Sequence, residues 1–174
     1  MPNHVVNELI FRGVDAATQD AIIAKLCNAD GKVDFEVLVP TPANVWLGNV
    51  GQQHGRLGAN ALDWSRENWG TKWNAYGHKP IERTDDTIVF RFDTAWSPPY
   101  SWLVAVFNTI KHGFDHNWLD EGASRGVEGL WNYEALKGSD FRKEPWSEKP
   151  CGDDMQKHLH KLRWGVESFD DEAA

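Results

Sequence analysis

The segment best suited to binding chemistry is the run Asn-Trp-Gly-Thr-Lys-Trp at residues 68–73. In a helix, Trp69 and Trp73 would share a face because they are four residues apart, whereas Trp64 would project from a different side. Lys72 could then hold an anion or a carboxylate beside an aromatic wall. The structural alternative is the commoner outcome: apolar pairs at helical spacing usually belong to a core, and Lys72 would then bridge to an acidic loop.

The adjacent carboxylates Asp120 and Glu121 form a second feature with chemical potential. Such a pair could perform acid–base catalysis or bind a hard cation. Neighbouring residues at a hairpin tip more often point apart and face water, so we favour a turn. The candidate residues for binding a partner or ligand come from these two segments: Trp64, Asn68, Trp69, Thr71, Lys72, Trp73, Asp120 and Glu121.

The histidines do not form a metal-binding pattern. Zinc requires three or four converging ligands, whereas the histidines occur as pairs, at 112 and 116 and at 158 and 160. We expect Gly113 to end a helix within the first pair, and the second pair would lie on different faces of a helix. The sequence therefore predicts no metal site.

Known catalytic and nucleotide-binding motifs are also missing from the sequence. The glycines at 48–58 are not followed by the Gly-Lys-Ser/Thr of a phosphate loop. There is no Gly-x-Ser-x-Gly elbow, and Cys27 has no evident base. We predict no cofactor and no catalytic residues, and therefore a non-enzymatic protein. An active site assembled from distant residues stays open as the alternative.

Composition narrows the class of partner. Acidic residues outnumber basic ones by 26 to 18 in the 174 residues, which gives a net charge of −8. This balance disfavours broad binding to a phosphate backbone and suits a partner with a basic surface. The two cysteines, Cys27 and Cys151, form no CxxC motif, and we expect them to be reduced. Without a signal peptide or a run of about 18 apolar residues, a cytoplasmic protein is expected.

Periodicity and turn signals divide the chain into alternating strands and helices. Apolar residues alternate at 5–12, 33–39 and 88–96, which predicts strands, and 114–119 with 127–136 predict a hairpin. Helical spacing predicts helices over 15–28, 98–113 and 155–166. Residues 43–85 are rich in Gly, Asn and Trp, and we interpret them as an insertion with a helix near 61–73.

This order predicts an α+β fold, a ferredoxin-like split βαβ sandwich with an antiparallel sheet and helices on one face. The insertion 43–85 would lie between strands 2 and 3. We expect one domain over 1–138 and a C-terminal extension over 139–174 that carries a short amphipathic helix.

Several strings resemble one known family. These are Met-Pro-Asn at the start, Pro-Thr-Pro at 40–42, Asn-Trp-Gly-Thr-Lys-Trp at 68–73 and Asp-Glu-Gly at 120–122. Together they resemble the YubB-like ferredoxin-fold proteins of phages and plasmids, over residues 1–138. The resemblance implies a fold and a mobile-element setting, but no established activity, cofactor or catalytic residue.

Three functional hypotheses follow. The first is a non-enzymatic phage or plasmid accessory protein in the cytoplasm of its host. It would bind a host protein with a basic surface and inhibit a nucleic-acid-handling or defence system, as anti-CRISPR and anti-restriction proteins do. The second is an enzyme or small-ligand-binding protein with a pocket between sheet and insertion. The third is single-stranded nucleic-acid binding through aromatic residues on the sheet, which the negative charge makes weaker than the first.

Overall fold

A computed structural model describes residues 3–45, 60–133 and 145–166 of the chain. Strands in the described part are β1 (His4–Arg12), β2 (Glu82–Arg83), β3 (Thr87–Ala95), β4 (Phe114–Asp120), β5 (Val127–Trp131) and β6 (Trp146–Pro150). Helices are α1 (Ala16–Leu26), α2 (Phe35–Leu38), α3 (Ala61–Asn68), α4 (Tyr100–Ile110) and α5 (Asp153–Trp164). No helix in these three ranges is both long and apolar enough to cross a membrane.

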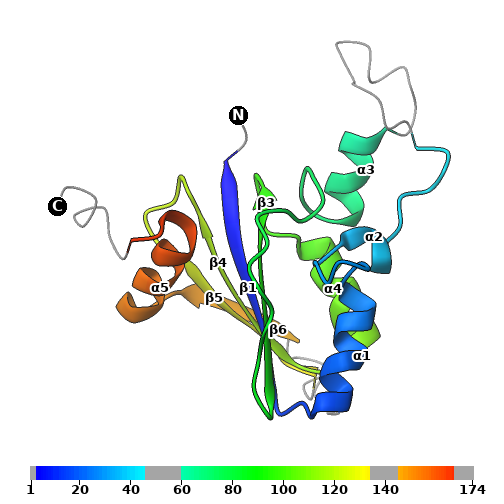
Figure 1. The fold of residues 1–174 in the computed structure, drawn as a ribbon. Helices are drawn as coiled ribbons and strands as arrows, with labels where there is room; N and C mark the ends of the chain where they lie inside the picture. Colours follow the sequence, from blue (N-terminus) through cyan, green and yellow to red (C-terminus); the bar gives the residue numbers. More distant parts are fainter. Residues whose placement is uncertain (1–2, 46–59, 134–144, 167–174) are drawn as a thin grey trace.

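The strands form one antiparallel sheet in the order β2-β3-β1-β4-β5-β6. The four strands β2, β3, β1 and β4, with α1 and α4 as the connecting helices, make the ferredoxin-like arrangement that the sequence predicts. Helices α1 to α4 lie on one side of the sheet and α5 lies on the other (Figure 1). The α+β, ferredoxin-like class is therefore confirmed. Helix α5 belongs to the predicted C-terminal extension and lies on the opposite face of the sheet.

The predicted second strand at 33–39 is also wrong. Val33 makes a single bridge to Cys27, and the chain then forms the short helix α2. The side chain of Asp34 caps this helix by accepting from the amide of Glu36, and the amide of Phe35 donates to the side chain of Asn74. A strand would place Phe35 and Val37 on the same face, whereas the helical turn buries Phe35 and leaves Val37 42% exposed. Alternation over seven residues therefore indicated a strand where capping by Asp34 and the bond to Asn74 favour a single helical turn.

The second strand of the ferredoxin-like arrangement is instead the two-residue β2, which pairs with Ile88 and Val89 of β3. The long connection over 43–81 therefore comes before the second strand and not after it. Residues 46–59 of the predicted insertion, with their glycines, lie outside the described residues, as do the end of the predicted strand 127–136 and the terminal acidic run.

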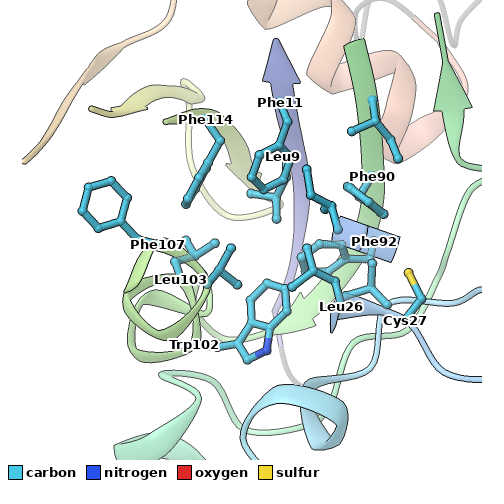
Figure 2. Close-up of a cluster of buried hydrophobic side chains, with 14 of the residues drawn as sticks. Leu9, Phe11, Leu26, Cys27, Phe90, Phe92, Trp102, Leu103, Phe107 and Phe114 are labelled. Atoms are coloured by element: carbon cyan, nitrogen blue, oxygen red, sulfur yellow. The ribbon is translucent and has the colours of Figure 1, made fainter. Parts of the chain in front are cut away.

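The main core lies between the sheet and helices α1, α2 and α4. Aromatic side chains from alternate positions of β1, β3 and β4 face Trp102, Leu103 and Phe107 of α4 (Figure 2). Phe35 of α2 packs against Phe92 and Trp102, with ring centroids 5.8 Å and 4.6 Å away. Since each of these rings is fully or almost fully buried, burial of aromatic surface dominates the stability of this layer.

The opposite face of the sheet is covered by α5. A smaller apolar cluster joins Val6 and Leu119 of the sheet to Leu159 of the helix and Cys151 before it. Strand β6 extends the sheet beyond β5, so residues 146–164 lie against the same sheet as the rest of the fold.

Candidate binding surface

Trp64, Trp69 and Thr71 anchor the segment 64–73 on the fold. The Trp69 indole packs edge-on against Trp64 and Phe35, with ring centroids 5.2 Å and 5.8 Å away, and its N–H donates to the carbonyl of Val39. Only 6% of Trp69 is exposed. The buried hydroxyl of Thr71 donates to the carbonyl of Ala95 at 2.7 Å. These residues are structural, and the structure supports the core interpretation for them.

Gly70 lets this segment approach the start of α4. Its φ of +84° is in the left-handed region, and a Cβ there would lie 2.8 Å from the amide nitrogen of Tyr100. The carbonyl of Gly70 accepts from the hydroxyl of Ser97 at 2.6 Å, and the amide of Trp102 donates to the carbonyl of Trp69. Asn68 has a local role, because its side chain donates to the carbonyl of Trp64.

Beyond this anchor, two cations lie over exposed indoles. The ammonium nitrogen of Lys72 is 4.2 Å from the ring centroid of Trp96 and 4.9 Å from that of Trp73. The guanidinium carbon of Arg66 is 5.8 Å from the Trp96 centroid. Trp73 and Trp96 are each 43% exposed. We call these four residues, Arg66, Lys72, Trp73 and Trp96, the aromatic–cationic surface.

Trp96 has an unusual backbone conformation. Its φ is +76°, a left-handed value that is a genuine outlier for a bulky side chain. The conformation is held from both sides: the amide of Trp96 donates to the carbonyl of Asn3, and the hydroxyl of Thr94 donates to the carbonyl of Ser97. Surrounding bonds thus maintain a strained backbone that projects an indole into solvent, a combination that points to a functional site.

A shallow hollow of about 410 Å³ adjoins the aromatic–cationic surface through Trp96. It is lined by residues at the ends of β3 and β4 and at the start of α4: Asn3, Trp96, Ser97, Pro98, Trp118, Asp120, Gly122 and Ala123. Asp120 supplies the charged side chain of this hollow. Its Oδ1 accepts from the amide of Gly122 at 2.6 Å and from the Asn3 side chain at 3.3 Å.

The two predicted acidic residues therefore separate. Asp120 and Glu121 start the turn between β4 and β5, and Asp120 lines the hollow while Glu121 points elsewhere. Glu121 accepts from Arg163 of α5 at 2.7 Å, which lowers the pKa of its carboxyl against the effect of partial burial. Within the described residues Lys72 forms no salt bridge to this loop, and its ammonium group lies over the two indoles instead.

The α5 side of the sheet holds a different constellation, a buried ion cluster around Glu8. The carboxylate is 2% exposed and accepts from Arg91 at 2.6 Å, His158 at 2.8 Å and Asn117 at 3.2 Å. Burial alone would raise the pKa of Glu8, but the hydrogen bonds and charges of His158 and Arg91 outweigh it and hold the pKa at about 2. This ion cluster fastens α5 to the sheet.

His116 is a second buried titratable group. It lies in β4 and faces the side of the sheet that α1 to α4 cover. Burial lowers its pKa to about 3, so the imidazole is neutral. Its Nε2 is 3.1 Å from the side-chain oxygen of Asn7. The neighbouring Tyr100 donates its hydroxyl to Glu148, and burial with this carboxylate raises the pKa of the phenol. His116 lines neither the hollow beside Trp96 nor the hollow on the α5 side of the sheet.

A hollow of about 540 Å³ lies on the α5 side, between the sheet and Met155. Four of its charged residues form two pairs, Arg12 with Asp115 at 3.0 Å and Lys149 with Glu128 at 3.1 Å, while Glu148 accepts from Tyr100 and Trp118. Within the described ranges, no group of three or more His, Cys, Asp or Glu could hold a metal ion. Cys27 and Cys151 are both buried free thiols.

A family model described as the ferredoxin-like domain in Api92-like protein matches residues 68–157, more than half of the chain. The chain belongs to this family. No curated protein and no solved structure matched the chain. The range of the Api92-like ferredoxin-like domain begins at Asn68 in α3, runs through β2 to β6 and ends inside α5. It includes Lys72, Trp73, Trp96 and the other residues that line the hollow except Asn3, but not Arg66.

Sequence reasoning on this Api92-like chain did not find Trp96, Arg66 or Pro98. Trp96 ends the alternating run 88–96, and alternation placed it with the buried face of that strand. The available signal was the string Trp-Ser-Pro-Pro at 96–99, because two prolines without backbone N–H groups cannot continue the strand ladder and so place its end close to Trp96. Arg66 could be placed near Trp96 only once the fold was known.

Proposed function

We propose that the protein is a non-enzymatic accessory protein that acts by binding another protein through the aromatic–cationic surface and the adjoining hollow. Residues of this kind, tryptophan and arginine above all, carry most of the binding energy in protein interfaces. The observation that carries the proposal is the exposed and strained Trp96, stacked beneath Lys72 and shared between the surface and the hollow.

The setting we propose follows from the YubB-like resemblance: a phage or plasmid protein that acts in the cytoplasm of its host. Its target would be a host nucleic-acid-handling or defence protein with a basic surface. The net charge of −8 and the carboxylate of Asp120 support a basic partner, because complementary charge speeds encounter and rejects wrong partners. Blocking restriction or CRISPR interference is the sharpest form of this proposal.

Single-stranded nucleic acid is the second candidate. Two exposed indoles flanked by Lys72 and Arg66 have the composition of a base-stacking platform. The net negative charge weighs against it, since the phosphate backbone requires a basic field. A gel-shift titration with single-stranded DNA and RNA at low salt separates the two candidates.

The experiment for the proposed function is capture of partners from host lysate at low and high salt. The variant should combine Trp73→Ala with Lys72→Glu, because both side chains are outside the core. Trp146→Ala is the matched control, as this indole is 39% exposed on β6 and does not line the hollow. We expect a protein captured by the wild type and by the control but lost from the double variant; equal capture by all three would remove this surface from the interface.

A further inference from the structure

We propose that the hollow beside Trp96 receives an extended, proline-rich segment of a partner protein that carries a basic side chain, an inference that rests on the proposed function. The lining combines two indoles, a proline and a carboxylate, contributed by Trp96, Trp118, Pro98 and Asp120. Grooves lined with aromatic residues are the sites at which proline-rich segments dock, because the polyproline II conformation is already formed before binding.

Strand addition cannot operate at this position. The hollow lies where β3 and β4 end: there the outer edge of β3 is already occupied by backbone bonds to Lys72 and Tyr76, and β4 is paired with β5 up to Trp118. A partner must therefore be held by side chains and not by a strand ladder. Prolyl rings suit such a surface because they bring apolar area without a backbone donor that needs a partner.

The polar groups of the hollow match what a proline-rich segment offers. The carbonyls of such a segment need donors, and the indole N–H of Trp96, a residue that is 43% exposed, makes no hydrogen bond within the described part of the chain. The Oδ1 of Asp120 is occupied by Gly122 and Asn3, while its Oδ2 accepts no bond from the described residues. A guanidinium or ammonium group of the partner would form a salt bridge with this carboxylate by donating to its Oδ2. The Trp118 indole is held in place by its bond to Glu148 at 3.2 Å.

Lys72 and Arg66 keep their positive charge over the indoles of the aromatic–cationic surface, but neither side chain lines the hollow. Their role here is to fix the orientation of Trp96. The charged side chain in the lining is Asp120, and the whole chain has a net charge of −8, which together favour a basic peptide over a phosphate backbone.

The test is a fluorescence-anisotropy titration of the full chain with labelled synthetic probes. The main probe is a peptide that alternates prolines with arginines. Two matched peptides replace the prolines with glycine or the arginines with glutamate, and oligothymidylate serves as the nucleic-acid probe. We expect the proline–arginine peptide to bind, and each replacement to weaken binding by about tenfold or more.

Variants assign the binding to the hollow. Trp96→Ala should weaken the proline–arginine peptide by about tenfold or more, and Asp120→Asn should abolish the preference for arginine over glutamate. Trp146→Ala should bind as the wild type does. Asp120→Asn changes a turn residue conservatively, so it gives an answer even if Trp96→Ala does not fold.

Three results would overturn the inference: equal binding of the glycine–arginine peptide, unchanged binding by Trp96→Ala, or binding of oligothymidylate alone. If the proline–arginine peptide fails while lysate capture still depends on Trp73 and Lys72, the partner class is wrong and the proposed function stands. If lysate capture fails as well, both are wrong.

Discussion

The two faces of the sheet are stabilised by different interactions. On the face covered by α1, α2 and α4, fully buried aromatic rings such as Phe35 and Trp102 fill the space between sheet and helices, and Trp69 packs the segment 64–73 against them. On the α5 side, a small apolar cluster is supplemented by ion pairs, with buried Glu8 as their centre. The proposed binding surface is built on the first layer. Acid and salt should therefore act mainly on the α5 layer and leave the binding surface intact.

The largest effect is expected from Trp69→Ala. Removing a buried indole that also donates to the carbonyl of Val39 leaves a cavity and an unpaired acceptor, which should lower the free energy of unfolding by about 3–5 kcal/mol. Denaturant unfolding followed by circular dichroism measures this loss. The exposed Trp146→Ala is the matched control, and an equal loss for both variants would contradict the anchoring role of Trp69.

Glu8→Gln tests the ion cluster on the α5 side. The folded pKa of about 2 lies below the ordinary value of 4.5, so the stabilisation is present above pH 5 and is lost as the pH falls towards 2. We expect a loss of about 3 kcal/mol at pH 7, because each pKa unit corresponds to about 1.4 kcal/mol. Unfolding curves between pH 7 and pH 2 provide the measurement. The difference between wild type and variant should shrink across this window; a constant difference would show that Glu8 acts without its charge.

Thr71→Val should lower the free energy of unfolding by an intermediate amount, since Thr71 lies between the buried Trp69 and the exposed Trp73. The hydroxyl both donates to the carbonyl and accepts from the amide of Ala95, and valine keeps the volume while removing both bonds. We expect a loss of about 1–3 kcal/mol in stability, as for a buried polar group that loses its partner. Thr71→Ser, which retains the hydroxyl, is the control. If valine and serine variants unfold at the same denaturant concentration, these bonds do not hold the strand end before Trp96.

The smallest effect on stability is expected from Trp73→Ala. Its indole is 43% exposed and contacts Lys72 and Tyr76 at the surface. The free energy of unfolding should therefore change by about 0.5 kcal/mol or less. Quenching of tryptophan fluorescence by acrylamide should nevertheless decrease, because an accessible indole is lost. A stability loss as large as that of Trp69→Ala would erase the distinction between anchor and surface.

The sequence predicted the strands and helices whose periodicity is long and uninterrupted. Alternation over 5–12 and 88–96 and helical spacing over 98–113 correspond to β1, β3 and α4. It failed at 33–39, where the apolar residues alternate as in a strand but the chain forms a four-residue helix that buries Phe35 and exposes Val37. It also could not find the two-residue β2, since so short a strand has no periodicity and is defined by its pairing with β3.

The binding surface was predictable only in part. The spacing of Trp69 and Trp73 suggested a shared helical face, but α3 ends at Asn68 and the chain turns at Gly70, so one indole is buried and the other exposed. Lys72 and Asp120 were identified as candidates, whereas their relation to Trp96 depends on how α3, β3 and β4 meet in space. The Glu8 cluster was beyond the sequence for the same reason: His158 reaches it from 150 residues away along the chain.

The most direct test of the proposed binding surface is site-specific photo-crosslinking in cells of the proposed host. A photoreactive phenylalanine analogue would replace Trp73, Trp96 or, as the control, Trp146, whose exposure is similar. We predict that the variants at 73 and 96 form a covalent adduct with the same host protein and that the variant at 146 forms none. An adduct at 146 with none at 73 or 96 would contradict the assignment of this surface as the binding site.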